Sequence, residues 1–346
     1  MKIAVAMSGG VDSSVVAGLM ARAGHEVIGI TLQLYDHGAA TSRKGACCAG
    51  QDIYDAKRVA DRLGIAHYVV DSEARFKKSV MSAFADSYAA GETPVPCIAC
   101  NQHLKFGDLL EMARDFGAEA MATGHYVRRI DGPEGAEMHQ AVDGSRDQSW
   151  FLFATTRAQL DFCRFPLGGY ASKAEVRAVA AEMGLAVAEK ADSQDICFVP
   201  SGSYAGIVEK FRPDALESGE VVAEDGRVLG SHQGIARYTI GQAKRLPDAA
   251  AHMVVKKIEP GTRRIVVGPR GTQSKTIRLR DVNWLVDPRE IRAEVKLRAR
   301  DTLHPASITP EGHGALLTLD EPALAAPGQA AVFYEGTRIL GGGFII

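Results

Sequence analysis

The sequence predicts an α/β protein: a domain built on a parallel sheet, then a small central domain, then a C-terminal antiparallel β-barrel. Three observations lead to this fold class. Strand-like and helix-like segments alternate over roughly the first 130 residues. A Gly-rich turn joins the first strand to the first helix. After Phe198, helical patterns become rare and short strands with Gly-containing turns replace them.

Each element of the first domain has its own signal. Apolar runs predict the strands, a period near 3.6 predicts the helices, and a glycine closes several helices. In chain order we expect a strand at 3–7, a helix at 12–23, a strand at 26–34, a helix at 51–63, a strand at 65–70, helices at 76–90 and 106–116, and a strand at 120–123. Ser172 and Glu175 form a capping-box pattern that predicts a further helix to about Met183.

The second half of the chain is divided by turn signals. Strands are expected at 264–267, 276–280 and 293–298, with turns at 225–226, 259–261 and 335–336. The changes of texture fall near 200–205 and 270–275. We therefore expect a parallel-sheet domain at 1–202, a small central domain at 203–272 and a barrel at 273–346.

Composition places the chain among ordinary globular proteins. It has 346 residues, of which 46% are hydrophobic, and a net charge of −2. No apolar stretch approaches the about 18 residues needed to cross a bilayer. The N-terminus begins a strand at once and lacks the features of a signal peptide. We expect a cytoplasmic protein with no membrane partner.

Residues 8–14, S-G-G-V-D-S-S, form the turn after the first strand. The turn lacks the Lys of a Walker A loop and the spacing of a dinucleotide fingerprint. It does supply two glycines, which let backbone N–H groups approach an anion, and three hydroxyl donors. Asp12, at the expected helix start, could cap the helix or help to hold Mg²⁺. The turn therefore predicts a phosphate site at the carboxyl end of the sheet.

Six cysteines fall in the first 200 residues, and three of them lie in stretches suited to chemistry. Cys97 and Cys100 form a C-x-x-C before a predicted helix, with Lys105 behind them. The helix N-terminus and the lysine are both expected to favour the thiolates. Cys197 lies in a distant stretch, D-S-Q-D-I-C-F. The turn at residues 8–14 resembles the PP-loop of the ATP pyrophosphatase superfamily, which implies that ATP activates an oxygen of the substrate. Reactive thiols beside such an oxygen suggest that sulfur replaces it.

The remaining cysteines carry weaker signals. Cys163 is expected to be a packing residue. Cys47 and Cys48 could join the C-x-x-C in a zinc site, but their spacing does not fit the usual ligand pairs, and we assign no metal ligands. An iron–sulfur cluster held by the three reactive cysteines is an open alternative.

Together these stretches resemble the tRNA-specific 2-thiouridylase family of the PP-loop ATP pyrophosphatase superfamily. The match is spread over nearly the whole chain, and the order and spacing of its motifs make it specific. Besides the S-G-G-V-D-S-S loop, the motifs are P-C-x-x-C-N-x-x-x-K-F-G from 96, A-T-G-H-Y at 122–126, R-D-Q-S-W at 146–150, F-P-L-G at 165–168, S-Q-D-I-C-F at 193–198, Y-T-I-G-Q at 238–242 and P-G-Q at 327–329.

The resemblance implies roles for particular residues. Cys100 would be the nucleophile and Cys197 the persulfide carrier, and the two would end the reaction as a disulfide. ATP would be held by Ala6, Met7, Ser8, Gly9, Gly10, Val11, Asp12, Ser13, Leu32 and Gly124. The tRNA would be contacted by Val95, Pro96, Cys97, His125, Asp147, Gln148, Ser149, Arg298, Ala299, Arg300 and Gln329.

Three positions depart from the family pattern. Val95 stands where Asn is frequent, which removes a side-chain amide near the base. Ala299 stands where an aromatic neighbour is frequent, and Ala243 where Arg is usual. None of these departures touches the two thiols.

The resemblance also implies a reaction. ATP with Mg²⁺ would adenylate O2 of the wobble uridine, position 34, in the tRNAs for Lys, Glu and Gln. Persulfide sulfur from a donor protein, either a sulfur-relay protein or a cysteine desulfurase, would then replace that oxygen. The base would have to leave its stack to be reached.

Other functions stay open at this point. Another PP-loop ATP pyrophosphatase, such as an amide-forming ligase, would need ATP but no thiols. An iron–sulfur-dependent tRNA thiolase would use the same cysteines differently. A thiol–disulfide or metal-binding module would be indifferent to ATP. A purely tRNA-binding protein would have no use for a pyrophosphate loop.

Charge is unevenly distributed along the chain. Residues 256–300 hold 13 Lys/Arg against 5 Asp/Glu, a local balance of +8. Such a segment can be a solvated face of hairpins or a footprint for phosphates. The resemblance favours the second interpretation, with the segment holding the tRNA backbone.

Overall fold

The computed structural model describes residues 1–35, 49–192, 196–199, 204–271 and 273–346. The chain divides into two compact units. The first unit consists of residues 1–79, 97–200 and 336–339, and the second of residues 80–96, 201–335 and 340–346. Cys47, Cys48 and residues 193–195 of the distant cysteine stretch lie outside the described residues.

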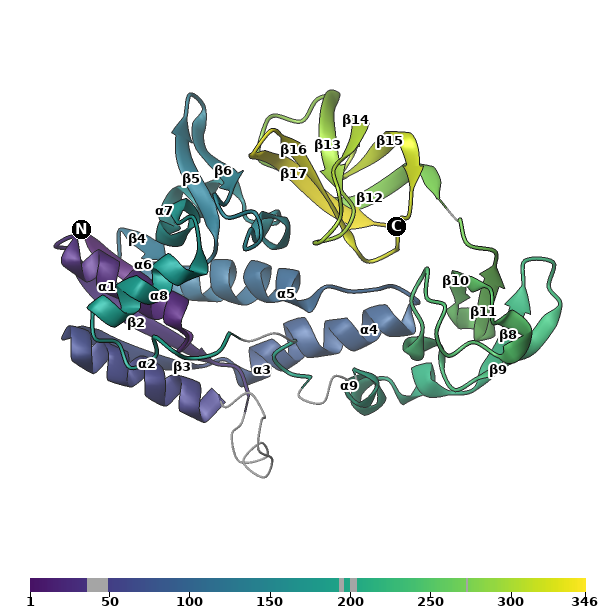
Figure 1. Ribbon diagram of the computed structural model, residues 1–346, viewed down its shortest axis with the longest axis horizontal. Helices are drawn as coiled ribbons and strands as arrows, with labels where there is room; N and C mark the ends of the chain where they lie inside the picture. The colour runs from purple at the N-terminus through teal and green to yellow at the C-terminus, as the bar shows by residue number, and fades with distance from the viewer. Residues whose placement is uncertain (36–48, 193–195, 200–203, 272) are drawn as a thin grey trace. The chain divides into compact units, whose positions relative to one another are not determined.

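The first unit is built on a five-stranded parallel sheet (Figure 1). Its strands, in spatial order, are β3 (Ala66–Asp71), β2 (Glu26–Gln33), β1 (Lys2–Ala6), β4 (Ala120–Ala122) and β7 (Cys163–Arg164). All four strand pairs are parallel. The chain leaves β1 toward β2 on one side and returns to β4 on the other. The point between β1 and β4 is therefore the topological switch point, where such sheets bind ligands.

Both faces of the central strand are covered. Ile3 and Val5 pack in one apolar cluster with side chains of α1 (Val11–Arg22), α2 (Ala49–Leu63) and α8 (Lys173–Glu182). Ala4, which points the other way, is also buried. A strand buried on both faces is continuously apolar, which is why β1 reads as one unbroken hydrophobic run.

The helical segments between β3 and β4 differ from the expectation. One run covers α3 (Glu73–Phe76), the π-helix η1 (Lys77–Ser82) and α4 (Ala83–Ala89), close to the expected 76–90. A second covers α5 (Pro96–Ala99), the π-helix η2 (Cys100–Asp108) and α6 (Leu109–Asp115), so the helix expected at 106–116 begins ten residues earlier. Pro96 suits the first helical position, whereas Gly107 inside the run obscured the periodicity.

The rest of the first unit contains short elements around the sheet. These are the hairpin β5 (Val127–Gly132) and β6 (Gly135–Gln140), the 3₁₀ helices η3 (Ser149–Leu152) and η4 (Pro166–Gly169), and α7 (Arg157–Phe162). Ser172 caps α8 by accepting from the Glu175 N–H, as expected. The Glu175 carboxylate accepts from the Ala171 N–H, so the reciprocal half of the expected capping box is displaced by one residue.

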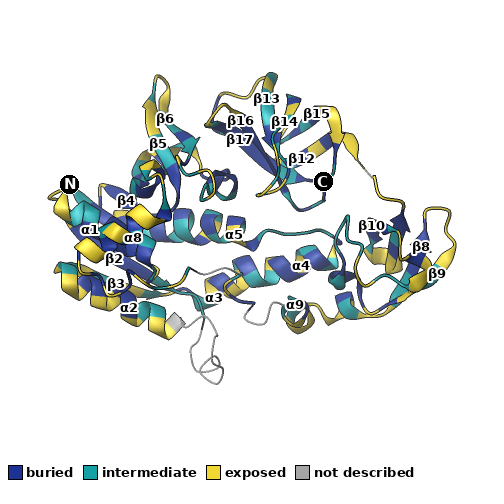
Figure 2. Cartoon of the chain, in the orientation of Figure 1, coloured by how far each residue is buried: buried dark blue, intermediate teal, exposed yellow. Residues whose placement is uncertain are grey.

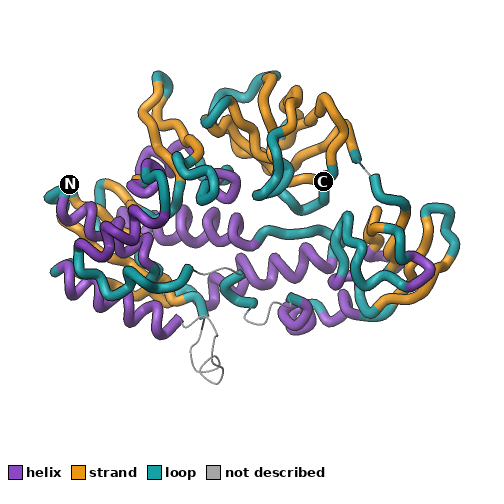
Figure 3. Tube along the Cα trace, in the orientation of Figure 1, coloured by secondary structure: helices purple, strands orange, loops and turns teal. Residues whose placement is uncertain are grey.

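The second unit contains a small four-stranded sheet. Its strands, in spatial order, are β10 (Val254–Glu259), β11 (Arg264–Gly268), β8 (Gly219–Ala223) and β9 (Val228–His232). The unit also includes α4, α9 (Ala205–Phe211) and the short helices η5 (Pro213–Leu216), η6 (Ile235–Arg237), η7 (Asp248–Ala250) and η8 (Pro260–Thr262). When the barrel described below is included, strands outnumber helices among the described residues of this unit, in contrast to the first unit (Figure 3).

The C-terminal strands close into a six-stranded antiparallel barrel. Their order is β12 (Ser274–Trp284), β15 (Gly314–Ala323), β14 (His304–Glu311), β13 (Ile291–Lys296), β16 (Ala330–Glu335) and β17 (Arg338–Ile345), and β17 pairs with β12 to close the circle. Its interior is apolar, and five consecutive residues of β16 are buried (Figure 2). The predicted fold class is confirmed.

Candidate active site

The turn between β1 and α1 has the geometry of an anion cradle. Gly9 adopts a left-handed backbone with φ of 74°, and a Cβ at this position would lie 2.0 Å from the Asp52 carbonyl oxygen. Only glycine fits there. The N-cap of α1 is Gly10, so no side chain covers the first-turn N–H groups of this 12-residue helix. The cradle fits the phosphates of ATP.

Hydroxyl groups line the same turn. The Ser13 Oγ accepts from the Ser8 N–H at 3.1 Å and lies 3.2 Å from the Ser8 Oγ. The Ser14 hydroxyl donates to the Gly10 carbonyl at 2.8 Å. The Ser13 hydroxyl also lies within 3.3 Å of the Gly10 carbonyl, so both serines of the helix bond to that carbonyl, and Ser8 is the exposed hydroxyl of the turn.

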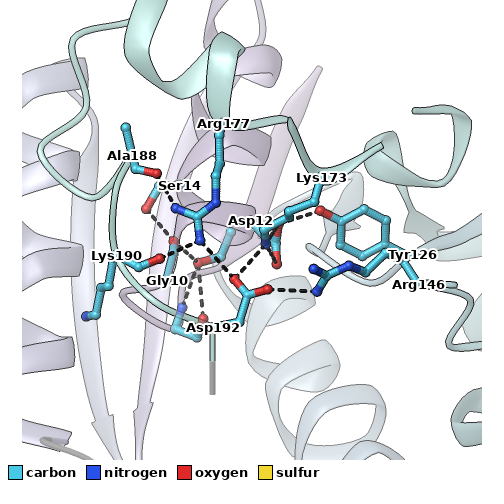
Figure 4. Close-up of polar contacts among 12 residues, drawn as sticks. Gly10, Asp12, Ser14, Tyr126, Arg146, Lys173, Arg177, Ala188, Lys190 and Asp192 are labelled. Atoms are coloured by element: carbon cyan, nitrogen blue, oxygen red, sulfur yellow. Dashed lines mark hydrogen bonds and ion pairs between the residues drawn. The ribbon is translucent and has the colours of Figure 1, made fainter. Parts of the chain in front are cut away.

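Asp12 does not cap the helix, which corrects one of the two roles the sequence left open. Its carboxylate turns toward a lysine and a tyrosine (Figure 4). The Lys173 ammonium donates to both carboxylate oxygens at 2.6 and 2.7 Å, and the Tyr126 hydroxyl donates at 2.6 Å. Burial and the Asp12 charge both raise the pKa of Tyr126, which keeps it a donor. Gly10 occupies the cap position, and the Asp12 carboxylate is instead held by Lys173 and Tyr126.

Lys173 supplies the cation that the turn itself lacks. Its residue is 9% exposed, and its ammonium lies between the carboxylates of Asp12 and Asp192, the second at 3.1 Å. Asp192 also accepts from Arg146 at 2.7 Å and from Arg177 at 3.3 Å. Burial works to raise the pKa of Asp192, but the bonds from Lys173 and Arg146 outweigh it and hold that pKa below its ordinary value.

Lys190 anchors the same segment to the phosphate turn. Its ammonium donates to the Gly9 carbonyl at 2.9 Å, to Asp52 at 2.7 Å and to Asp55 at 2.6 Å. Burial favours the neutral amine, but the two aspartates overcome it and raise the pKa of Lys190. The Arg177 guanidinium donates to the Lys190 carbonyl at 2.7 Å. The approach to the Cys197 stretch is thus fixed against the phosphate turn.

Leu32 and Gly124 lie on the two strands that flank β1. Leu32 is near the end of β2, and Gly124 follows β4 by two residues. A Cβ at Gly124 would lie 3.0 Å from the Asp12 Cβ and 3.0 Å from the Ser13 nitrogen. Gly124 therefore lies beside the phosphate turn at the switch point, whereas Leu32 lies across β1 on β2, and a nucleotide contact by either residue stays a prediction.

The thiols of the C-x-x-C lie within a helical run. Cys97 belongs to α5, and Cys100 is the first residue of the π-helix η2. π-Helical turns occur frequently at functional sites. Cys97 and Cys197 are exposed, and Cys100 is half-buried. Cys163 is buried in β7, as expected of a packing residue.

The expected lowering of the thiol pKa values is not found. Burial raises the pKa of Cys100, and Lys105 opposes it without cancelling it. Loss of hydration at its sulfur also raises the pKa of Cys97, although the residue as a whole is exposed; Lys105 opposes this shift and Cys197 adds to it. The sequence predicted correctly that Lys105 acts on both thiols. It could not predict that the loss of hydration shifts the thiol pKa values further than the lysine does.

Several predicted tRNA-contacting side chains are engaged inside the first unit. His125 is buried, its Nδ1 lies 2.9 Å from the Thr123 hydroxyl, and burial lowers its pKa well below the ordinary value. Asp147 accepts from the hydroxyl of Ser149, which is fully buried. Gln148 accepts from the Tyr126 N–H at 2.8 Å. These residues shape the wall around Tyr126, and a direct RNA contact stays a prediction.

The other predicted tRNA contacts belong to the second unit, apart from Cys97. Val95 is half-buried, Pro96 is buried, and Arg298 and Arg300 are exposed on either side of the half-buried Ala299. The Gln329 side chain donates to the Thr93 carbonyl at 2.8 Å, so it holds the segment that precedes the C-x-x-C.

The basic segment is partly neutralised within the second unit. Among the described residues, six of its cations pair with carboxylates: Lys257, Arg263, Arg264, Arg280, Arg292 and Arg298. Exposed pairs of this kind are individually weak. The charge available to a partner is therefore smaller than the sequence balance of +8 suggested.

Sequence reasoning assigned no role to four of the residues that surround Asp12. Tyr126, Arg146, Lys173 and Asp192 come from four separate segments, and no spacing rule connects them. The signal was present in part: three of them lie in or next to the motifs A-T-G-H-Y, R-D-Q-S-W and D-S-Q-D-I-C-F.

Among the described residues no group of three or more His, Cys, Asp or Glu side chains is arranged to hold a metal ion. In the same part of the chain, no helix is long and apolar enough to cross a membrane.

Comparisons with known proteins identify the family of the chain. Residues 1–201 match a family described as the tRNA methyl transferase HUP domain, residues 206–269 its PRC-barrel domain, and residues 274–345 an aminomethyltransferase beta-barrel domain. A 4-thiouridine synthetase–RNA complex with bound ATP is a weak structural match, with a TM-score of 0.35 and 17% identity over 62% of this chain and 50% of that one.

The similarity to relatives is much closer. The tRNA-specific 2-thiouridylase MnmA of Acidiphilium cryptum is 69% identical over 100% of both chains. That of Gluconobacter oxydans is 63% identical over 100% of this chain and 99% of its own length. The chain belongs to the tRNA-specific 2-thiouridylase family.

Proposed function

We propose that the chain is a tRNA-uridine 2-sulfurtransferase: it uses ATP to replace O2 of the wobble uridine by sulfur, giving 2-thiouridine, AMP and pyrophosphate. The observation that carries the proposal is the pairing, in one compact unit, of a pyrophosphate-type turn with the cysteines Cys100 and Cys197. A phosphate turn alone would suit any ATP pyrophosphatase. The thiols select sulfur transfer, because adenylation turns a poor leaving group into a good one for attack by sulfur.

The ATP site would be formed by residues 6–13, Leu32 and Gly124. The α1 N-terminus and the hydroxyls of Ser8 and Ser13 would receive the phosphates. Asp12 would be the carboxylate that holds Mg²⁺, which would supply charge neutralisation at the phosphate oxygens. Lys173 would then be free to turn from Asp12 toward the departing pyrophosphate, so one ammonium would stabilise both states of the site.

The thiols would act in sequence. Cys197 would receive sulfur as a persulfide from a donor protein, a sulfur-relay protein or a cysteine desulfurase. The terminal sulfur would attack C2 of the activated base. Cys100 would attack the bridging sulfur, which would release 2-thiouridine and leave a Cys100–Cys197 disulfide. A thiol reductant would restore the two thiols. Since burial raises the pKa of Cys100, its thiolate would have to form after the RNA has changed its surroundings.

The tRNAs for Lys, Glu and Gln would be the substrates. Val95, Pro96 and Cys97 would lie against the target base, and His125 with residues 147–149 would form the wall beside it. Arg298, Ala299, Arg300 and Gln329 would serve the tRNA from the barrel. In this proposal residues 1–202 form the catalytic domain, 203–272 the central domain and 273–346 the barrel, and the enzyme acts in the cytoplasm.

Nucleoside mass spectrometry tests the reaction class. Unmodified tRNA is incubated with the protein, ATP, Mg²⁺ and sulfide, and 2-thiouridine is expected to appear with one AMP per product. The family that residues 1–201 match is described as a tRNA methyl transferase domain. A parallel reaction therefore contains S-adenosylmethionine in place of ATP and sulfide. Methylated uridine there, with no 2-thiouridine in the first reaction, contradicts the proposal.

Cysteine variants separate the remaining alternatives. With a persulfide donor, Cys100→Ser is expected to load sulfur at Cys197 but not to complete thiolation, whereas Cys163→Ala, a buried cysteine in β7, serves as the matched control. Full activity of Cys100→Ser favours an amide-forming ligase. A requirement for iron that copurifies under anaerobic conditions favours the cluster alternative.

A further inference from the structure

Three cysteines, rather than two, gather in the first unit. Cys97 lies within electrostatic range of both of the proposed catalytic thiols: it raises the pKa of Cys100, and Cys197 raises the pKa of Cys97. Only two residues of one helical run separate Cys97 from Cys100, one partner of the disulfide that the proposed reaction leaves behind. The reaction as proposed assigns no redox role to this third thiol.

Cys97 and Cys100 share one helical run. α5 ends at Ala99 and η2 begins at Cys100 without a break. Residues three apart on a helix are neighbours on one face, with Cβ atoms about 5–6 Å apart, so a disulfide needs only a shift of about 1–2 Å. A Cys100–Cys197 disulfide instead joins two separate segments of the chain. The C-x-x-C disulfide leaves the Cys197 segment unconstrained.

The two thiols of the C-x-x-C also differ in their exposure to solvent. Cys97 is exposed to solvent, whereas Cys100 is half-buried. Lys105 opposes the rise in pKa of both thiols of the C-x-x-C, so one cation serves whichever of them carries the negative charge. The Nζ of Lys105 lies 3.5 Å from the Nε2 of His125, which is buried and has a lowered pKa. A neutral imidazole there accepts from the ammonium and adds no competing charge.

We propose that Cys97 is a resolving thiol that takes over the disulfide at the end of each cycle and returns Cys197 to its thiol form. This inference rests on the proposed sulfur transfer. The Cys97 thiolate attacks the Sγ of Cys100 in the Cys100–Cys197 disulfide. The Cys97–Cys100 bond forms, the Cys100–Cys197 bond breaks, and Cys197 leaves as a thiolate that takes up the proton lost by Cys97. The number of disulfides does not change.

The exchange has a functional consequence. Cys197 can accept the next persulfide sulfur before any reductant has acted. The Cys97–Cys100 disulfide then needs two electrons from an external dithiol, which can attack the exposed Cys97 sulfur. Reduction and sulfur loading thus become separate events on separate residues.

Disulfide mapping after one turnover tests the inference. The full-length protein is loaded by a cysteine desulfurase with cysteine, freed of small thiols, and given ATP, Mg²⁺ and unmodified tRNA. The reaction is quenched with acid, free thiols are alkylated, and peptides are mapped. We expect a Cys97–Cys100 disulfide with Cys197 alkylated. A Cys100–Cys197 disulfide with Cys97 alkylated overturns the inference and leaves the proposed function intact.

Two variants sharpen the result. Cys97→Ser is expected to stop at the Cys100–Cys197 disulfide, whereas Cys163→Ala should give the wild-type map. With limiting dithiothreitol, the rate of later turnovers is divided by the rate of the first turnover for each protein. This ratio should be several-fold lower for Cys97→Ser than for wild type. An unchanged ratio overturns the inference. Failure of the proposed function would show differently, as absence of 2-thiouridine even when wild-type protein is supplied with sulfide.

Discussion

At the scale of single residues, Asp12 links the phosphate turn to the rest of the site. Its carboxylate accepts from Lys173 and from Tyr126, and those two residues come from segments far away in the sequence. Without a lysine in the turn itself, the charge balance of the site depends on this arrangement. A carboxylate whose partner can turn away is also a suitable ligand for Mg²⁺.

Replacing Asp12 by Ala is expected to reduce pyrophosphate release by roughly 10²–10³, the loss typical of removing one preorganised electrostatic contact. The binding of tRNA should change little, because Asp12 faces the phosphate turn. Pyrophosphate release and tRNA binding are measured on the same preparation. Asp131→Ala, which removes an exposed hairpin carboxylate, is the control. A wild-type rate of release for Asp12→Ala would remove the turn from the ATP site.

The ion pairs of Asp192 predict how the free energy of unfolding depends on pH. Replacing it by Asn leaves Lys173, Arg146 and Arg177 without their shared carboxylate, and should lower the free energy of unfolding by about 1–3 kcal/mol at neutral pH. The folded-state pKa of Asp192 is lowered, so its contribution is complete above the unfolded value of about 3.9 and fades as pH falls through the folded pKa.

Urea unfolding of the wild type and Asp192→Asn checks this at several pH values. The difference between the two proteins should be equal at neutral and mildly acidic pH and shrink only in strong acid. A difference that shrinks between neutral pH and about pH 5 would show that another group carries the effect.

At the scale of elements, close packing at the switch point constrains Gly124. Gly124→Ala would place a methyl group 3.0 Å from the Asp12 Cβ and the Ser13 nitrogen. The turn or the strand must then shift, and we expect half-maximal pyrophosphate release to need about tenfold more ATP, equivalent to about 1.4 kcal/mol. Gly144 is the matched control, because a Cβ there meets no atom within 4 Å. Equal ATP dependence of the two variants would contradict the packing argument.

The helical run that begins at Pro96 makes a prediction about thiol reactivity. In the protein without tRNA, the alkylation rate of Cys100 should rise with a midpoint above the ordinary thiol pKa of about 8.5, because burial outweighs Lys105. Lys105→Met should move the midpoint higher, and Lys105→Arg should restore it.

Mass spectrometry of iodoacetamide-treated protein gives both rates and sites. Cys163, whose pKa is raised to about 12 by burial, provides the internal reference for an inert cysteine. A Cys100 midpoint below the ordinary value would mean that the lysine and the helix terminus win, as the sequence alone suggested.

The elements also show how far the sequence could predict the structure. Strands β1 to β4 are apolar runs, and helices α1, α2 and α8 have clear start or end signals, so each lies within about two residues of its expected place. The start of the helix at Pro96 was missed, because Cys, Asn and His are weak helix formers and Gly107 interrupts the pattern. β7 has two residues, too few for any periodicity.

At the scale of the whole molecule, prediction succeeded where a property is local and failed where it depends on distant partners. The change from alternating helices and strands to consecutive strands is visible in the sequence, and it gave the fold class. The site around Asp12 and the ion pairs of the basic segment depend on residues brought together only by folding. Arg263 and Glu217 illustrate this, since they pair at 2.6 Å although each follows a different 3₁₀ helix, η8 and η5.

Those ion pairs shape the last prediction, which concerns tRNA binding. Each cation that replaces a counterion at a phosphate steepens the dependence of affinity on salt by about 0.7–0.9 in the logarithmic slope. Arg300 is exposed, and Arg298 is paired more loosely than Arg263, with its carboxylate partner Asp301 at 3.5 Å rather than 2.6 Å. Arg298→Ala and Arg300→Ala should each weaken tRNA binding and flatten the slope by about one such step, additively in the double variant. Arg263→Ala is the matched control: its cation is equally exposed but already paired at 2.6 Å, so its slope should change least. Affinity is measured by filter binding over a series of salt concentrations. If the double variant keeps the wild-type slope, the cations at 298 and 300 face solvent only, and the tRNA is held elsewhere.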